Sequence, residues 1–184
     1  QSQEVVWSLI ELITRIKMET IEMIYHENIL DHYKYPHNFG IIENATVHHH
    51  EHNPLCGDEI DLYLVIDEDK NVVDGLSEAT HGFTPRKVLT DFAVIGKAFC
   101  FSKKVVDVKF YGKGCAISQA SASMLTDQIK GKTLGDLKEI TKEQLLGMLG
   151  IPISPVRLKC ALLSLDTLKN SILIFERYIN KKDI

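Results

Sequence analysis

The stretch EIDLYLVI, residues 59–66, alternates apolar and polar side chains with a period of two residues. Such alternation predicts a β-strand with one buried face. Four apolar side chains would share that face: Ile60, Leu62, Leu64 and Ile66. Further strands are expected near residues 45–51 and over residues 105–111, and the polar run EDKN at residues 68–71 is typical of a hairpin turn.

Apolar residues at three- and four-residue steps predict helices around these strands. One is expected over residues 22–32, before the sheet. Four more should follow it, over residues 118–129, 133–140, 141–149 and 156–179. The last is the longest and carries a continuous apolar stripe: Leu158, Leu162, Leu165, Leu168, Ile172, Phe175 and Ile179. We therefore expect an α+β fold, a small antiparallel β-sheet with helices packed mainly on one face.

The chain of 184 residues is too short for two ordinary domains. We divide it into an N-terminal helical extension, residues 1–22, and a single domain, residues 23–180. Residues 76–103 are expected to be a segment inserted between strands. In it Thr84-Pro85 is typical of a helix start, so an inserted helix is expected.

Charge and hydropathy exclude several classes of function. The net charge is only -4, and no basic stripe interleaved with aromatic residues is present, so no nucleic-acid partner is expected. Charged residues interrupt the first 24 residues, which predicts neither a membrane span nor a secretory signal.

The expected compartment is the reducing cytoplasm. There the four cysteines are expected to be ligands, nucleophiles or core residues and not disulfides: Cys56, Cys100, Cys115 and Cys160.

The loop NPLCGD, residues 53–58, carries the first candidate ligands. Its proline and glycine predict a tight turn that presents the thiol of Cys56 and the carboxylate of Asp58, two positions apart. Both side chains can reach one metal ion. Without a cysteine two positions before it, Asp58 would be interpreted as a cap of the following strand or as an ion-pair partner.

Two further cysteines lie where a thiolate is favoured. Cys115 follows Gly-Lys-Gly at a predicted strand end, where exposed backbone N–H groups and Lys113 favour the negative charge. Cys160 lies near the start of the last helix, beside Lys159, where the positive helix end should lower the thiol pKa. Thiolates select zinc or iron-sulfur centres, and a carboxylate as fourth ligand predicts an exchangeable site.

Simpler interpretations account for the remaining candidates. Cys100 lies between two phenylalanines and is expected in the core. Residues 48–52 hold four histidines, which can bind metal, but strand alternation would divide them between two faces, and this favours an exposed edge strand. The glycines around Lys113 lack the full spacing of a phosphate-binding loop.

Four motifs, in this order, resemble the IscU/SufU/NifU N-terminal family. They are YHENILDHY with PHNFG (residues 25–40), NPLCGD (53–58), GKGCAISQASAS (112–123) and PVRLKC (155–160). The resemblance implies a scaffold on which a cysteine desulfurase deposits sulfur, iron is added, and a [2Fe-2S] cluster forms and passes to apo-proteins. It also implies four ligands, Cys56, Asp58, Cys115 and Cys160, with Cys160 as the first persulfide acceptor. Such a protein is a carrier and not an enzyme with its own turnover.

Departures from the family pattern leave the subtype open. IscU-type members have histidine at the position of Lys159, whereas the lysine found here resembles SufU-like zinc-dependent sulfur acceptors. Zn²⁺ is therefore the alternative occupant of the candidate site. The spacing from Cys115 to Cys160 is nevertheless short, as in IscU. The Hsp70/J-type chaperone-recruitment segment is matched only partly, at residues 154–157. A zinc hydrolase or deaminase is disfavoured, because HExxH and the HxE with CxxC pair are absent from the sequence.

Overall fold

The structure is a computed structural model that describes residues 14–15, 23, 25–67 and 102–182. Several expectations lie outside these residues. They are the hairpin turn after residue 67, the helix expected within the inserted segment, Cys100, and nearly all of the N-terminal extension.

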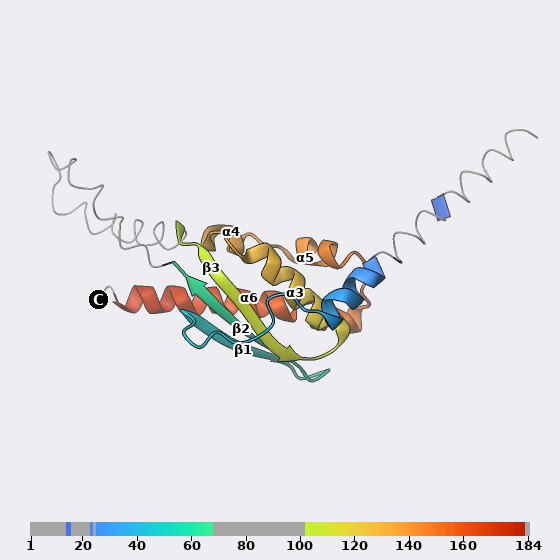
Figure 1. The fold of residues 1–184 in the computed structure, drawn as a ribbon, viewed down its shortest axis with the longest axis horizontal. Coiled ribbons are helices and arrows are strands. Elements are labelled where there is room, and N and C mark those ends of the chain that lie inside the picture. The colour runs from blue at the N-terminus through green and yellow to red at the C-terminus, as the bar shows by residue number, and fades with distance from the viewer. Residues whose placement is uncertain (1–13, 16–22, 24, 68–101, 183–184) are drawn as a thin grey trace, which may run out of the picture.

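Three strands form an antiparallel sheet in the order β1-β2-β3 (Figure 1): β1 Val47–Asn53, β2 Asp58–Ile66 and β3 Val105–Lys113. The predicted alternation in β2 is confirmed, since its four apolar side chains are all buried. In the register, Leu64 lies opposite Val47 on one side and Val108 on the other. One apolar layer therefore runs across all three strands.

Four helices follow the sheet: α3 Ala116–Ile129, α4 Leu134–Lys138, α5 Lys142–Leu149 and α6 Pro155–Lys182. Thr133 and Thr141 cap α4 and α5 with reciprocal capping boxes, which satisfy backbone N–H groups at each helix start. The predicted helix over residues 133–140 is shorter than expected, because the chain must leave helical geometry before Thr141 can cap the next one.

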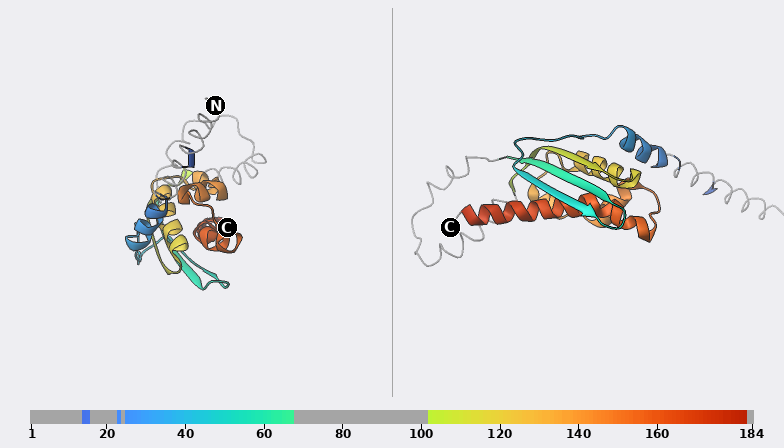
Figure 2. Two further views of the ribbon diagram at one scale, coloured as in Figure 1. Left: turned by 90° about the vertical axis from the view of Figure 1, so that its right-hand side faces the viewer. Right: turned by 90° about the horizontal axis from the view of Figure 1, so that it is seen from below.

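Helices α3 and α6 cover one face of the sheet; α5 packs on both of them, and α4 packs on α6 (Figures 1 and 2). The α6 stripe is confirmed: five members are buried and the other two pack against the core. Phe110 of β3 and Phe175 of α6 are among the largest fully buried side chains. The predicted α+β architecture, with helices mainly on one face, is thus the observed one.

Residues 25–34 form a helix that packs on α3 and is coloured blue in Figure 1. Ile29 is buried there, in a cluster with Ile117 and Met124. The chain then runs along the free side of β3, where Gly40 N–H donates to the carbonyl oxygen of Phe110 at 2.8 Å. The N-terminal segment is thereby joined to both α3 and β3.

Within the described residues, no helix combines the length and the apolar character that crossing a membrane requires.

Candidate metal centre

The turn between β1 and β2 presents the Cys56 thiol. Gly57 N–H donates to the carbonyl oxygen of Asn53 at 2.8 Å, and the side-chain oxygen of Asn53 accepts from Leu55 N–H at 3.1 Å. The φ angle of Gly57 is 71°, a left-handed conformation that glycine adopts at little cost. Cys56 is consequently held at the tip of a closed loop with its side chain exposed.

Asp58 connects the start of β2 to the start of α3. Its side chain is 2% exposed, and its Oδ1 accepts a hydrogen bond from the Cys115 N–H at 3.0 Å. The Cys115 Sγ lies 3.6 Å from Oδ2 of the same carboxylate. The strand-end cysteine is therefore already in contact with the predicted carboxylate ligand.

Cys160 lies in the first turns of α6 and is 5% exposed. Its Sγ is 3.0 Å from the Cys56 Sγ, and the Nδ2 amide of Asn53 donates to it at 3.7 Å. Two cysteines far apart along the chain thus meet at the β1–β2 loop.

A buried hydroxyl pair fixes the two helices that carry Cys115 and Cys160. Ser121 of α3 donates from Oγ to the carbonyl oxygen of Ala161 at 2.7 Å and lies 2.8 Å from the Oγ of Ser164. Small side chains at this crossing allow the helices to approach closely. The contact therefore joins α3 to the residue of α6 that follows Cys160.

The predicted ligands converge. Cys56, Asp58 and Cys160 each offer a ligand atom, and these atoms all lie within 4.8 Å of one another. Cys115 joins the group through its contacts with the Asp58 carboxylate. The donor set is three sulfurs and one carboxylate, which suits a soft or borderline metal and matches zinc or iron-sulfur centres.

The electrostatics of the site differ from expectation at one cysteine. Burial raises the pKa of Cys160, and its contacts with Cys56 and with the negative Asp58 raise it further. The prediction that the helix start lowers this pKa was wrong, because burial and a neighbouring carboxylate outweigh the partial charge of the helix end. Without metal, Cys160 is therefore a neutral thiol near neutral pH.

The Asp58 carboxyl behaves in the opposite way. Burial raises its pKa, but hydrogen bonds from Cys56, Cys160, the Cys115 N–H and Ser118 together lower it below its ordinary value of 3.8. The carboxylate is thus ionised and able to act as a ligand near neutral pH.

The two predicted neighbouring lysines lie at the surface. Lys113 forms an ion pair with Glu59 at 3.2 Å, so its charge is shared with β2. Lys159 is exposed on the first turns of α6.

The histidine tract lies in β1, the edge strand, and its side chains divide between the two faces, as expected. His48 and His50 both contact the Oδ1 of Asp61, at 2.9 and 3.2 Å. His49 is half-buried on the opposite face and contacts Glu51 at 2.9 Å.

Two residues of the site were missed by sequence reasoning. Asn53 shapes the loop and contacts the Cys160 sulfur, and Ser118 bonds to Asp58. Asn53 had a usable signal, since asparagine before proline is typical of side-chain-closed turns. Ser118 had no such sequence signal, because a serine in the first turn of a helix is common.

Comparison with known proteins adds independent observations. The NifU-like N terminal domain family matches residues 24–84 and 100–182, most of the chain. The interruption falls inside the segment predicted to be inserted.

Individual relatives agree with this match. The chain is 30% identical over 169 residues to the zinc-dependent sulfurtransferase SufU of Bacillus subtilis, covering 83% of this chain and 91% of that protein. It is 28% identical to the iron-sulfur cluster assembly scaffold protein IscU of Rickettsia prowazekii, covering 88% of this chain and 99% of that one. A crystal structure of a putative iron-sulfur cluster assembly scaffold protein for the SUF system, from Fervidobacterium islandicum, is 31% identical with a TM-score of 0.54, covering 82% of this chain and 98% of that one.

Proposed function

This chain belongs to the NifU-like N terminal domain family and is an iron-sulfur cluster assembly scaffold, and we propose that Cys56, Asp58, Cys115 and Cys160 hold its cargo. The cargo is a [2Fe-2S] cluster or the Fe²⁺ from which it is built. The observation that carries the proposal is the convergence of these residues, three of which bring ligand atoms within 4.8 Å of one another.

The mixed donor set suits temporary storage. Three thiolates bind iron tightly, whereas the hard carboxylate of Asp58 is the weaker partner for a soft or reduced centre. Asp58 is also held by the Cys115 N–H, which competes for its oxygen lone pairs. Asp58 is therefore the ligand that leaves first when the cluster moves to an apo-protein.

Sulfur enters at an exposed cysteine. Cys56 and Cys115 are both exposed, but the Cys115 sulfur is in contact with the Asp58 carboxylate, whereas Cys56 lies at a loop tip. Cys160, expected from the family resemblance to be the first acceptor, is buried, and its pKa is raised. In the proposed step the Cys56 thiolate attacks the outer sulfur of a persulfide on the desulfurase. The S–S bond of that persulfide breaks, the desulfurase cysteine leaves as a thiolate, and Cys56 becomes the persulfide.

A cysteine desulfurase would dock beside this loop. Leu55 and Val156 are 72% and 83% exposed, the first next to Cys56 and the second one turn before Cys160. Exposed apolar side chains next to a reactive group favour a protein partner. Apo-proteins that receive the cluster are proposed as later partners, and the reducing cytoplasm as the compartment.

Anaerobic reconstitution with iron, cysteine and a desulfurase tests the proposal. The wild-type chain should gain visible charge-transfer absorption, and after incubation with an apo-ferredoxin and separation of the two proteins the absorption should be found on the ferredoxin. Asp58→Ala should retain the cluster longer, because its departing ligand is missing. Equal or faster transfer by Asp58→Ala contradicts the role of Asp58, and a chain that stays colourless contradicts the scaffold chemistry.

A second candidate is a zinc-containing sulfur acceptor of the SufU type. Two observations favour it: Lys159 in place of histidine, and the similarity to SufU. It predicts one tightly held Zn²⁺ per chain and desulfurase stimulation that disappears in Cys56→Ala and Asp58→Ala. Elemental analysis after anaerobic purification separates the two candidates, since the scaffold chemistry requires iron with acid-labile sulfide.

A further inference from the structure

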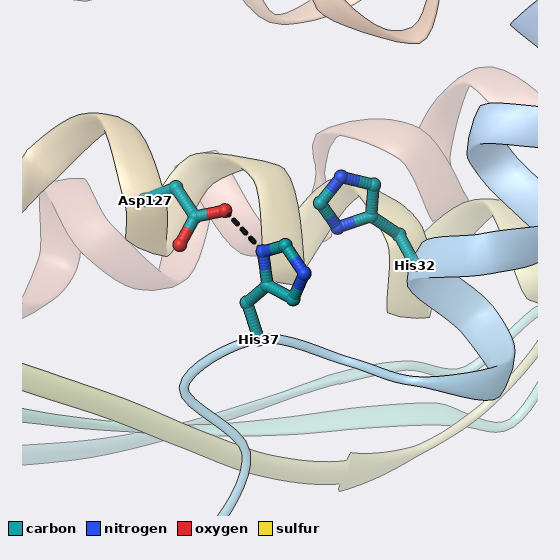
Figure 3. A group of neighbouring side chains, drawn as sticks. All are labelled: His32, His37 and Asp127. Carbon is teal, nitrogen blue, oxygen red and sulfur yellow. Dashed lines mark hydrogen bonds and ion pairs between the residues drawn. The ribbon is translucent and has the colours of Figure 1, made fainter.

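A second group of ligand-type side chains lies on the opposite side of α3 from α6 (Figure 3). His32 is in the helix of residues 25–34, His37 is in the loop after it, and Asp127 is in the last turn of α3. Each offers one ligand atom, and these atoms all lie within 4.8 Å of one another. None of them contributes to the site formed by Cys56, Asp58, Cys115 and Cys160, which is called the thiolate site below.

The group is held in place by contacts with α3. The His37 Nδ1 lies 2.7 Å from Asp127 Oδ2, and the two imidazole rings of His32 and His37 are 4.6 Å apart at their centroids. Ser123 of α3 accepts from the backbone N–H of His37 at 2.8 Å and lies 2.8 Å from the His32 Nδ1. Asn38 donates to the second oxygen of Asp127 at 2.8 Å. Both histidines and the carboxylate are thus positioned by neighbours.

We propose that His32, His37 and Asp127 form a binding site for a divalent transition metal ion, separate from the thiolate site. Two imidazoles and one carboxylate without sulfur select borderline cations of the Zn²⁺, Fe²⁺, Co²⁺ and Ni²⁺ class. A metal with bonds of about 2.0–2.2 Å places neighbouring ligand atoms about 3.4 Å apart, so small side-chain rotations are sufficient here.

Solvent access fits this assignment. The side chains of His37 and Asp127 are 52% and 44% exposed, so an ion can enter directly and water can complete its coordination. The alternative is that His37 and Asp127 form only a surface ion pair. That alternative accounts for the contact of His32 with Ser123 but not for the placing of a second imidazole ring beside the His37–Asp127 pair (Figure 3).

Metal binding here would join the N-terminal segment to α3. Asp127 lies twelve positions after Cys115 along the chain, which corresponds to about 18 Å of helix, so the two sites hold separate ions. The segment after His37 pairs with β3, the strand that leads to Cys115. An occupied site would therefore fix the N-terminal segment against both elements that flank Cys115.

The test uses the full chain with all four cysteines replaced by serine, so that no thiolate remains. Titration with Co²⁺ should give one bound ion per chain, with visible d–d bands and without the near-ultraviolet thiolate charge-transfer band. In competition with a chromophoric chelator, Zn²⁺ should bind at the same stoichiometry. His32→Gln, His37→Gln and Asp127→Asn should each weaken binding at least about tenfold.

The matched control is His48→Gln/His50→Gln, which removes two histidines that also share a carboxylate, Asp61. This double variant should bind as tightly as its parent. Loss of binding in the control with retention in His37→Gln would place the ion on the sheet edge and overturn the proposal. Absence of binding to the folded parent overturns it as well.

A second measurement uses the wild-type chain, in case the serine variant does not fold. After the thiolate site is filled with Zn²⁺, added Co²⁺ should broaden the NMR signals of the His32 and His37 rings before those of His48 and His50. Simultaneous or reversed broadening contradicts the site.

Discussion

A β-carbon at position 114 would lie 2.7 Å from the Oδ1 of Asp58. The backbone of Gly114 therefore passes so close to the carboxylate that any β-carbon at this position would force a neighbouring atom to move. This close approach allows the next N–H, that of Cys115, to donate to the same oxygen. The glycine that precedes Cys115 thus makes the contact between the cysteine and the carboxylate possible.

Gly114→Ala should separate Asp58 from Cys115 and weaken metal retention. The new methyl group would also meet Ser118 Oγ at 2.6 Å, so either the carboxylate or the backbone must move. We expect at least a tenfold loss in Zn²⁺ affinity by chelator competition, comparable to the loss of a second-shell contact. Gly147→Ala is the matched control, because its β-carbon meets nothing within 4 Å. The control should keep its affinity and gain about 0.5–1 kcal/mol in unfolding free energy.

The pH dependence of stability should reveal the ionised Asp58. Its pKa in the folded chain is lowered from 3.8, so its ionisation stabilises the apo-protein above that pH and the contribution is lost as pH falls through the folded value. The difference in unfolding free energy between wild type and Asp58→Asn should be constant from neutral pH to about pH 5 and shrink in more acidic buffer. Urea denaturation at a series of pH values measures it, and a difference that stays flat or grows on acidification contradicts the assignment.

The Ser121 to Ala161 contact should contribute both to stability and to the site. Ser121→Ala leaves the buried carbonyl of Ala161 without this donor, and the expected loss is about 1–3 kcal/mol in unfolding free energy. Ser164→Ala and the double variant complete a cycle that isolates the hydroxyl pair. Because the contact adjoins Cys160, metal affinity should fall in Ser121→Ala too. Unchanged stability in that variant would show that the hydroxyl does not fix the crossing.

The proposed docking surface predicts a selective loss of desulfurase stimulation. Leu55→Asp and Val156→Asp place a charge on exposed apolar positions beside the site and should lower stimulation while metal content is unchanged. Leu173→Asp is the control, since Leu173 is 46% exposed much further along α6. Sulfide-release assays measure the effect. Equal stimulation by all three variants would place the docking surface elsewhere.

The sequence predicted the fold because the signals were local and repeated. Ile60 and Leu64 alternate with polar residues in a way that only a half-buried strand accommodates, and the α6 stripe repeats over many turns. Thr133 and Thr141 were expected as helix starts from the same kind of short-range pattern. The exact end of α4 was not predicted, because helix ends depend on a few competing hydrogen bonds.

The sequence by itself determined which residues are the candidate ligands, since the loop NPLCGD and the cysteines at 115 and 160 lie in motifs that can be read directly. Tertiary structure alone decided how these residues behave. The raised pKa of Cys160 and the lowered pKa of Asp58 arise from burial and from partners distant in the chain, and so does the grouping of His32 and His37 with Asp127. Local sequence sets the backbone conformation and the side chains available, whereas the desolvation and charge that set reactivity exist only after distant segments pack together.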